Sequence, residues 1–386
     1  MLRNPKFRHL PRIAAAAALL ALLPACDKDK DVEPPAELVK LKATLDVQRA
    51  WSVSLGGGDE NMRGGLSPTS DGERVYAAGR GGDVIAVQVT NGKTVWRAKT
   101  KAELSGGPGV GHGLVAVGTV NGEVIVFDAA SGERRWSAKV GSEVLSAPAI
   151  AESAVVVRTV SGRLLGLASA DGRELWREDQ QIPRLTLRGA ASPAIAGNTA
   201  VCGFDNGRVV SVDATRGEIL WDQLVSPARG RTELERLVDI DSAVKVSGDE
   251  VFVAGFQGKV SMLALDNGQA WWSKDISSHR GLDVDAERVV ITSAMGEVVA
   301  LRRRTGVELW RQDGLRLRRL SAPAIVGSHV AVADFEGYVH WLNAETGAFV
   351  ARSKSGGRTS NAPVVVGDTV IFQDDEGRVT ALRPKG

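Results

Sequence analysis

Few residues of this chain have the types and spacing that chemistry requires. Its 386 residues include five scattered histidines and two cysteines, Cys26 and Cys202. The histidines lack the short spacings of metal ligands, and the cysteines are not adjacent. Cys202 lies within an apolar strand pattern, so it is predicted to pack in the core rather than to react. The residue types therefore favour neither a metal centre nor a bound cofactor.

Two pairs of aspartates, each spaced two residues apart, could act together. Asp283 and Asp285 are interpreted as the edge of a strand rather than as a calcium site. Asp239 and Asp241 lie in a stretch that is predicted to be extended, so both carboxylates would point to the same side. The second pair is therefore the better candidate for a functional site.

The N-terminal residues predict export and anchoring. Basic residues precede an apolar stretch over residues 13–23, which is typical of a signal peptide and too short to cross a bilayer. The segment Leu23-Pro24-Ala25-Cys26 resembles a bacterial lipobox, in which the cysteine is acylated. The sequence thus predicts a signal peptide over 1–25, a lipid anchor at Cys26 and a flexible tether over 26–45. The alternative is that Ala25 ends the signal of a soluble exported protein.

The charge balance excludes one class of partner. The whole chain has a formal net charge of +2, and removal of the four basic residues in 1–25 changes it to −2. Phosphate backbones are bound by strongly basic faces. We therefore expect no nucleic-acid partner.

A repeat organises the rest of the chain. Eight copies contain Gly-x-[Val/Leu] fourteen residues after a position that is proline in six of them. A second glycine follows ten residues later in seven copies, and a tryptophan four residues further on in six. The first glycines are Gly82, Gly122, Gly162, Gly207, Gly258, Gly296, Gly337 and Gly377. A period near 40 with four short strand patterns predicts an all-β, eight-bladed β-propeller with four-stranded antiparallel blades.

The ends of the chain are predicted to close the ring. The eighth copy stops at Gly386, before its second glycine and its tryptophan. Residues 49–53 have the pattern of the tryptophan strand, centred on Trp51, with no blade before them. We expect them to pair as the outer strand of blade eight, which gives a propeller over residues 46–386 and removes an open sheet edge. The repeated tryptophans are predicted to pack between blades rather than to stack on ligands.

The repeat varies in length only between one blade and the next. Two long neighbouring gaps follow Trp176 and Trp221, and a gap after Trp51, as long as the one after Trp176, is rich in glycine. Because strands alternate in direction, all these connections emerge on one face, where rigid scaffolds commonly carry function. We call residues 182–190 loop 1 and residues 229–242 loop 2.

Loop 1 has the composition of an interface. Leu185 and Leu187 beside Arg188 provide apolar anchors and a forked cation. An alternative stays open, in which the two leucines tuck under the loop and the aspartates of loop 2 cap turns.

The repeat Asp-x-x-[Ser/Thr]-Gly-x-x-x-Trp resembles the quinoprotein, or PQQ-like, propeller repeat. Quinoprotein dehydrogenases commonly carry adjacent cysteines and a calcium site, which this sequence lacks, so we expect no catalysis. More specific are Leu-x-Leu-Arg-Gly at 185–189, Arg-Leu-x-Asp-Ile-Asp at 236–241 and the stretch 335–343. These are similar to the BamB family, the lipoproteins of the machinery that assembles outer-membrane β-barrels.

That resemblance implies a non-catalytic scaffold without a cofactor, which binds the periplasmic domains of the barrel-forming subunit BamA. The implied contact residues are Leu185, Leu187, Arg188, Asp239 and Asp241. Nascent outer-membrane proteins are a further implied partner, and the implied location is the periplasmic face of the outer membrane. Asp27, next to the acylated cysteine, leaves retention in the inner membrane open. The alternative functions are a PQQ-dependent dehydrogenase-like quinoprotein and a ligand-sensing periplasmic propeller.

Overall fold

The computed structural model describes residues 1, 33–55, 65–187, 189 and 191–385. It divides into two units, Met1–Pro35 and Ala36–Gly386, and the second unit contains the strands. The signal peptide, Cys26, Asp27, Arg188 and most of the glycine-rich connection after Trp51 lie outside the described residues. Within the described part, no helix has the length and apolar character needed to span a membrane.

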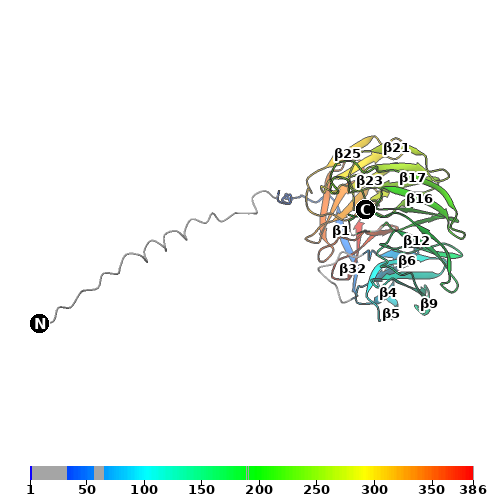
Figure 1. Cartoon of the computed structure of the whole chain (residues 1–386). Coiled ribbons are helices and arrows are strands. Elements are labelled where there is room, and N and C mark those ends of the chain that lie inside the picture. The colour runs from blue at the N-terminus through cyan, green and yellow to red at the C-terminus, as the bar shows by residue number, and fades with distance from the viewer. Residues whose placement is uncertain (2–32, 56–64, 188, 190, 386) are drawn as a thin grey trace. The chain divides into compact units, whose positions relative to one another are not determined.

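The second unit consists of eight antiparallel sheets of four strands each (Figure 1). Blades one to four comprise β2 (Thr69–Ser70), β3 (Arg74–Ala78), β4 (Asp83–Gln88), β5 (Thr94–Lys99); β6 (Leu104–Gly111), β7 (Leu114–Thr119), β8 (Glu123–Asp128), β9 (Arg134–Lys139); β10 (Ala149–Ile150), β11 (Ala154–Arg158), β12 (Arg163–Ala168), β13 (Glu174–Asp179); and β14 (Ala194–Ala196), β15 (Thr199–Gly203), β16 (Arg208–Asp213), β17 (Ile219–Leu224). Blades five to eight comprise β18 (Lys245–Ser247), β19 (Glu250–Ala254), β20 (Val260–Ala264), β21 (Ala270–Lys274); β22 (Leu282–Val284), β23 (Arg288–Thr292), β24 (Val298–Arg302), β25 (Glu308–Gln312); β26 (Ala324–Val326), β27 (His329–Ala333), β28 (Tyr338–Asn343), β29 (Phe349–Lys354); and β30 (Val364–Val366), β31 (Thr369–Gln373), β32 (Arg378–Lys385), β1 (Asp46–Ser54). The predicted eight-bladed propeller is confirmed.

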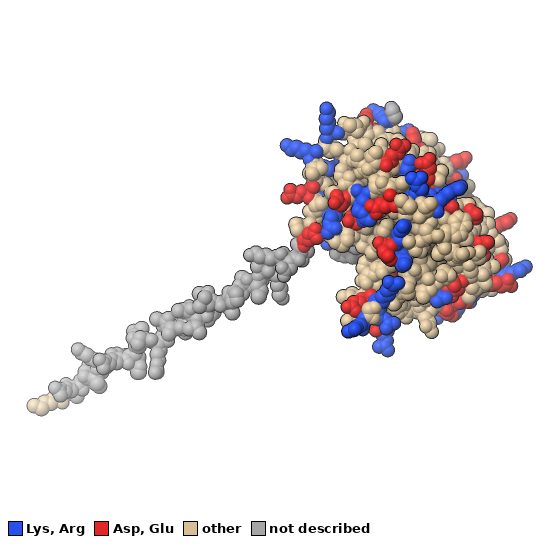
Figure 2. All heavy atoms as spheres, turned by 90° about the horizontal axis from the view of Figure 1, so that it is seen from above, with Lys and Arg blue, Asp and Glu red and all other residues tan. Residues whose placement is uncertain are grey.

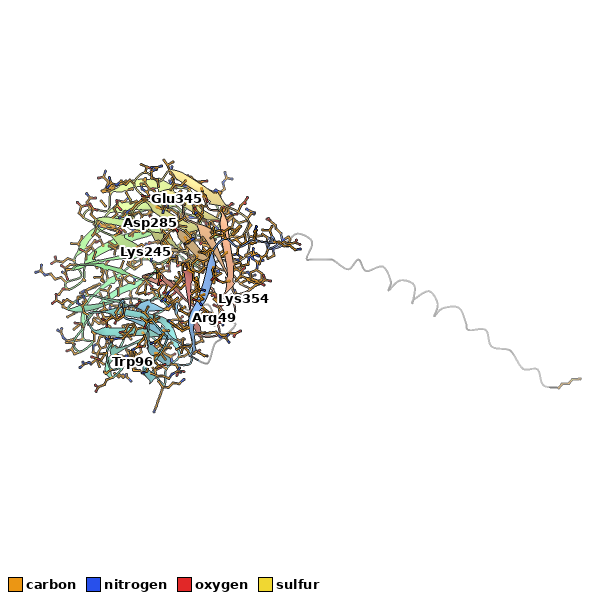
Figure 3. All side chains as sticks on the ribbon, turned by 180° about the vertical axis from the view of Figure 1, so that it is seen from behind. Arg49, Trp96, Lys245, Asp285, Glu345 and Lys354 are labelled. Carbon is orange, nitrogen blue, oxygen red and sulfur yellow. The ribbon has the colours of Figure 1, made fainter. Side chains whose placement is uncertain are left out.

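The ring closes through the N-terminal strand. The inner strands contact one another in chain order, and β2 of blade one contacts β30 of blade eight. β1 pairs antiparallel with β32, and Trp51 lies opposite Ala381. On the other side of β1, the Arg49 guanidinium donates to the Lys354 carbonyl of blade seven at 3.3 Å, and Figure 3 shows the two residues on neighbouring strands. The predicted closure is therefore confirmed.

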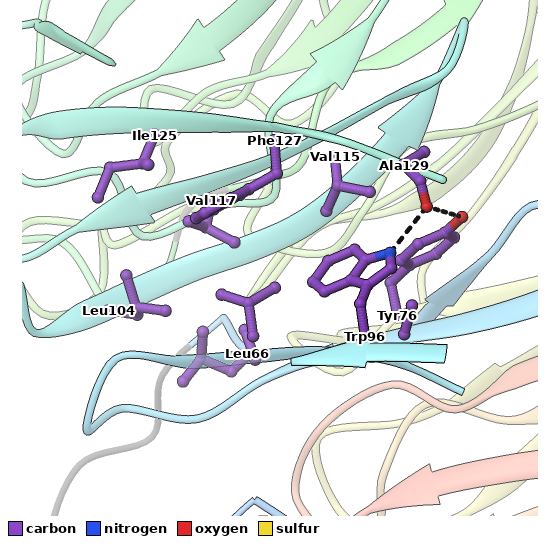
Figure 4. Close-up of a cluster of buried hydrophobic side chains, with 12 residues drawn as sticks. Leu66, Tyr76, Trp96, Leu104, Val115, Val117, Ile125, Phe127 and Ala129 are labelled. Atoms are coloured by element: carbon purple, nitrogen blue, oxygen red, sulfur yellow. Dashed lines mark hydrogen bonds between the residues drawn. The ribbon is translucent and has the colours of Figure 1, made fainter. Parts of the chain in front are cut away.

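The repeated tryptophans join each blade to the next. Trp96 of blade one donates its indole N–H to the carbonyl of Ala129 in blade two at 2.9 Å, beside the Tyr76 hydroxyl (Figure 4). Gly132 has a φ of 74°, and a Cβ there would lie 2.5 Å from the Trp96 ring, so only glycine fits the turn that receives the indole. The seven donor–acceptor pairs are Trp51 with Val89, Trp96 with Ala129, Trp136 with Ser169, Trp176 with Ala214, Trp221 with Leu265, Trp272 with Arg303, and Trp310 with Ala344. The prediction that these rings pack between blades is confirmed.

The exception, Ala351 in blade seven, has a topological reason. A tryptophan at position 351 would dock on the turn between the third and fourth strands of blade eight. Those strands are β32 and β1, the two ends of the propeller, so no such turn joins them. Trp341, opposite Ala351 on β28, is fully buried and donates to the Ser353 hydroxyl at 3.0 Å. Trp341 therefore fills the core where a docking tryptophan has no turn to receive it.

Residues 36–45, which we call the strap, lie against the loop after blade six and against blade seven. The Ala36 N–H donates to the Arg316 carbonyl at 2.9 Å, and the Thr44 N–H donates to the Val350 carbonyl at 2.8 Å. Arg318 donates to the Ala36 carbonyl at 3.0 Å, and Arg352 donates to the Val39 carbonyl at 3.2 Å. The sequence pattern assigns these residues to the flexible tether. Their contacts with blade seven could not be predicted, because the partner residues lie some 300 positions away and leave no local signal.

The connections between blades lie on one face, as the alternation of strands predicts. The Thr100 N–H donates to the Gly82 carbonyl at 2.7 Å, and the Gln180 N–H donates to the Gly162 carbonyl at 3.0 Å. Each bond joins an interblade connection to the turn between the second and third strands of the preceding blade. We call this side the loop face; loops 1 and 2 lie there on either side of blade four.

Candidate functional site

The C-terminal part of loop 2 is wedged between blades four and five. Ile240 is fully buried against Gly203, and its N–H donates to the Phe204 carbonyl at 3.3 Å. The carbonyl of Asp239 accepts the N–H of Phe256, at 2.7 Å, from the corresponding turn of blade five. The backbone of Asp239 is thus fixed by the rigid ring.

The tip of loop 2 is a self-contained turn. The Glu235 carboxylate accepts the N–H groups of Arg231 at 2.7 Å and Thr232 at 3.2 Å, and these bonds lower the pKa of Glu235. Thr232 Oγ1 in turn accepts the Glu235 N–H at 3.2 Å, which completes a reciprocal cap of the kind seen at helix starts. This turn presents Leu234, whose side chain is 66% exposed.

Loop 1 is held on loop 2 by the aspartate pair. The Asp239 side chain is fully buried and accepts the N–H of Leu187. Gly189 lies beside the Asp241 carboxylate, and a Cβ at Gly189 would lie 2.5 Å from its Cγ, so a side chain there would displace the carboxylate. Both carboxylates therefore face loop 1, as the two-residue spacing predicts.

The predicted contact residues occupy different layers. Leu185 is 42% exposed and available to a partner, whereas Leu187 is half-buried. Asp239 lies beneath loop 1 and accepts a hydrogen bond from its backbone. This agrees with the alternative interpretation, in which the aspartates of loop 2 hold the backbone instead of contacting a partner. Any contribution of Asp239 to partner binding would therefore act through the position of loop 1. Partner contact by the remaining residues, including Arg188 outside the described part, stays a prediction.

Burial governs the electrostatics of the pair. Burial raises the pKa of Asp239 to about 7, although the Leu187 N–H acts in the opposite direction. Burial, followed by the nearby charges of Asp239 and Asp205, raises the pKa of Asp241 to about 8. One oxygen of each carboxylate is buried with no hydrogen-bond partner among the described residues. The site thus contains two acids that titrate near neutral pH.

Two residues that sequence reasoning missed complete this cluster. Arg158, at the end of β11, is fully buried and forms an ion pair with Asp205, in the turn after β15. The signal in the sequence is a charged residue at a repeat position that is otherwise uncharged. This position lies four residues before the first glycine of each repeat, and copy three has Arg158 there. The other copies have Ala78, Gly118, Gly203, Ala254, Thr292, Ala333 and Gln373.

The described residues offer little for metal or covalent chemistry. No group of three or more His, Cys, Asp or Glu among them is arranged to hold a metal ion. Asp283 accepts the Ile325 N–H at 2.9 Å and pairs with Lys245 at 3.3 Å, as expected of a strand edge. Cys202 is buried, and burial raises the pKa of its thiol to about 12. Acidic and basic side chains are interspersed on the face shown in Figure 2.

The fold and its repeats define a propeller of the PQQ-like repeat class. The sequence pattern described as outer membrane protein assembly factor BamB matches residues 37–103, 80–312 and 294–385. A protein named outer membrane protein assembly factor BamB from Pseudomonas aeruginosa is 49% identical over 372 residues, which cover 95% of this chain and 97% of that protein. The chain belongs to the BamB family of outer membrane protein assembly factors, and it is a non-catalytic member of the PQQ-like propellers.

Solved structures agree with this assignment. The crystal structure of BamB from Moraxella catarrhalis matches with a TM-score of 0.79 and 28% identity, covering 88% of this chain and 100% of that one. A quinohemoprotein alcohol dehydrogenase from Comamonas testosteroni matches with a TM-score of 0.67 and 13% identity, covering 88% of this chain and 76% of that one. At that identity the second likeness shows the fold alone.

Proposed function

We propose that this protein is a scaffold lipoprotein of outer-membrane β-barrel assembly, and that loops 1 and 2 bind the periplasmic domains of a BamA-like barrel-forming subunit. The observation that supports this most directly is that the backbone of loop 1 is held in place by a buried side chain. Its exposed Leu185 lies two residues from a backbone N–H that is bonded to the buried Asp239. A loop fixed in this way presents an apolar side chain at little entropic cost on binding.

The surroundings of Leu185 support the same surface. Ile182 of loop 1 and Leu234 of loop 2 are also exposed, on connections at either side of blade four. Apolar side chains gathered on one face, with arginine beside them, are typical of protein interfaces. Loops 1 and 2 therefore offer apolar anchors for one partner surface.

The test is binding of purified periplasmic domains of the BamA-like subunit, measured by calorimetry. We expect Leu185→Ala to weaken binding by about 2 kcal/mol, roughly thirtyfold. Val95→Ala is the matched control, because Val95 is 44% exposed on the outer strand of blade one and should leave the affinity unchanged. Equal affinity of the two variants, with both folded by circular dichroism, would place the interface elsewhere.

We further propose anchoring by acylated Cys26 at the periplasmic face of the outer membrane, with nascent barrel proteins as a second partner. The anchor is supported by the lipobox-like end of the leader, and the membrane by the family. Asp27 leaves retention in the inner membrane open, and separation of the two membranes on a density gradient decides between them.

A further inference from the structure

Arg158 is an unusual residue at its place in the repeat. Its side chain is fully buried at the end of β11, where seven of the eight copies have an uncharged residue. A buried guanidinium is costly unless its surroundings compensate it. The residues that surround Arg158 should therefore indicate the role of its charge.

Its surroundings connect blade three to a turn of blade four. The guanidinium pairs with Asp205 and lies 5.2 Å from the centroid of the Phe204 ring, and both partners belong to the turn after β15. Its Nε and Nη1 atoms are buried without a hydrogen-bond partner in the described part of the chain, as is one oxygen each of Asp239 and Asp241. The cluster thus combines one cation with three carboxylates.

Arg158 reaches the aspartate pair of loop 2 through geometry more than through its charge. Burial is the main cause of the raised pKa values of Asp239 and Asp241; Asp205 raises both further, and the Arg158 charge acts in the opposite direction as the weakest influence on each. Asp239 in turn accepts the Leu187 N–H, and Asp241 lies against Gly189. The geometric route from Arg158 runs through the turn after β15, because the Phe204 carbonyl accepts the N–H of Ile240, which lies between the two aspartates, at 3.3 Å.

We propose that Arg158 is a positioning residue for partner binding: its ion pair with Asp205 fixes the turn after β15, this turn holds Ile240 and with it Asp239 and Asp241 under loop 1, and loop 1 thereby keeps the conformation that presents Leu185. This inference rests on the proposed binding function of loops 1 and 2. Arg158 has no exposed surface and acts through the aspartates, so it makes no contact with the partner itself.

The decisive variant replaces the pair rather than the arginine alone. Arg158→Met by itself would leave Asp205 buried and unpaired, and such a loss can unfold a protein. Arg158→Met with Asp205→Asn removes both charges and keeps most of the side-chain volume. We expect this double variant to keep the circular dichroism spectrum and cooperative melting of the parent, and to bind the partner's periplasmic domains at least tenfold more weakly.

The chain supplies a matched control pair. Arg303 of blade six pairs with Glu250 of blade five and lies 5.5 Å from the centroid of the Phe252 ring, so it repeats the chemistry of Arg158 away from both loops. Arg303→Met with Glu250→Gln should leave the affinity unchanged. Arg158→Lys keeps the charge that pairs with Asp205 but loses the planar guanidinium over Phe204, so it should bind more tightly than the Arg158/Asp205 double variant, a partial rescue that a role in volume alone does not predict.

The outcomes separate this inference from the proposed function. If Leu185→Ala weakens binding and the Arg158/Asp205 double variant does not, the positioning role is refuted and the interface stands. If Leu185→Ala leaves the affinity unchanged, the proposed interface itself fails. Equal weakening by the Arg158 and Arg303 double variants would also overturn the inference, because it would reflect general destabilisation. In a double-mutant cycle, Asp239→Ala should reduce partner affinity less in the Arg158/Asp205 double variant than in the parent.

Discussion

Trp51→Ala tests the closure of the ring, because this side chain joins the N-terminal strand to blade one. Its indole is buried, donates to the Val89 carbonyl at 2.7 Å and lies against Gly92. Truncation of a buried tryptophan costs about 3–5 kcal/mol, through lost burial and the cavity that is left. It also leaves the Val89 carbonyl without this donor.

That loss converts to a measurable change in melting temperature. Unfolding entropy is about 2.1 cal/mol/K per residue, or roughly 0.7 kcal/mol/K for a ring of this length. A loss of about 3–5 kcal/mol therefore lowers Tm by roughly 4–7 °C in differential scanning calorimetry. Trp271→Ala is the control, because Trp271 is 51% exposed and lies outside the repeated series, so its Tm should change little.

The comparison with an internal blade makes the test specific. If β1 closes the ring, Trp51→Ala should destabilise about as much as Trp96→Ala, because each indole is buried and donates to a carbonyl of the next blade. A Trp51→Ala protein that melts within about 1 °C of the parent would refute the reasoning, since the ring would then be stable without this contact.

Three further outcomes are expected. Cys26→Ala should release the folded protein from membranes into the soluble periplasmic fraction in cells that lack the partner, as followed by immunoblot after fractionation; persistent membrane association there would contradict anchoring at this residue. The raised pKa values of Asp239 and Asp241 mean that the folded state binds protons more readily than the unfolded chain, so their contribution to stability is present below about pH 4 and is lost as the pH rises through about 7 to 8. In urea titrations, Asp241→Asn should therefore stabilise the protein relative to the parent more at pH 8.5 than at pH 5, and an equal effect at both would remove the case for titration near neutrality. Asp239→Asn should keep partner affinity near that of the parent, because the amide oxygen can still accept the Leu187 N–H, whereas Asp239→Ala should weaken binding; the same calorimetric assay measures both, and equal losses would show that the carboxylate charge itself is needed.

The ring could be predicted because its signals repeat. Each tryptophan and the glycine that receives it recur at fixed spacings, and their contact is local to two adjacent blades. The closing strand was predictable for the same reason, since Trp51 carries the pattern without a preceding blade. The missing tryptophan at Ala351 is explained by the observed closure, because β32 and β1 of blade eight are not joined by a turn.

The layering of the candidate site could not be predicted in the same way. The exposure of Asp239 depends on how loop 2 is wedged between two turns and on how loop 1 lies over it, and these contacts join residues some fifty positions apart. Arg158 contributes from a third blade. Spacing indicates that Asp239 and Asp241 share a side, but only tertiary packing shows that this side faces loop 1 rather than solvent.

The strap has a mechanical consequence for a chain held at its N-terminal end. Tension applied there reaches Ala36 and Val39 before it reaches β1, because the strap precedes β1 in the chain. The bonds of these residues to Arg316, Arg318 and Arg352 must break before β1 can be peeled from β32. The strap thus carries the tension before it reaches β1. The propeller can therefore be held by the same end of the chain that closes the ring, and the ring stays closed.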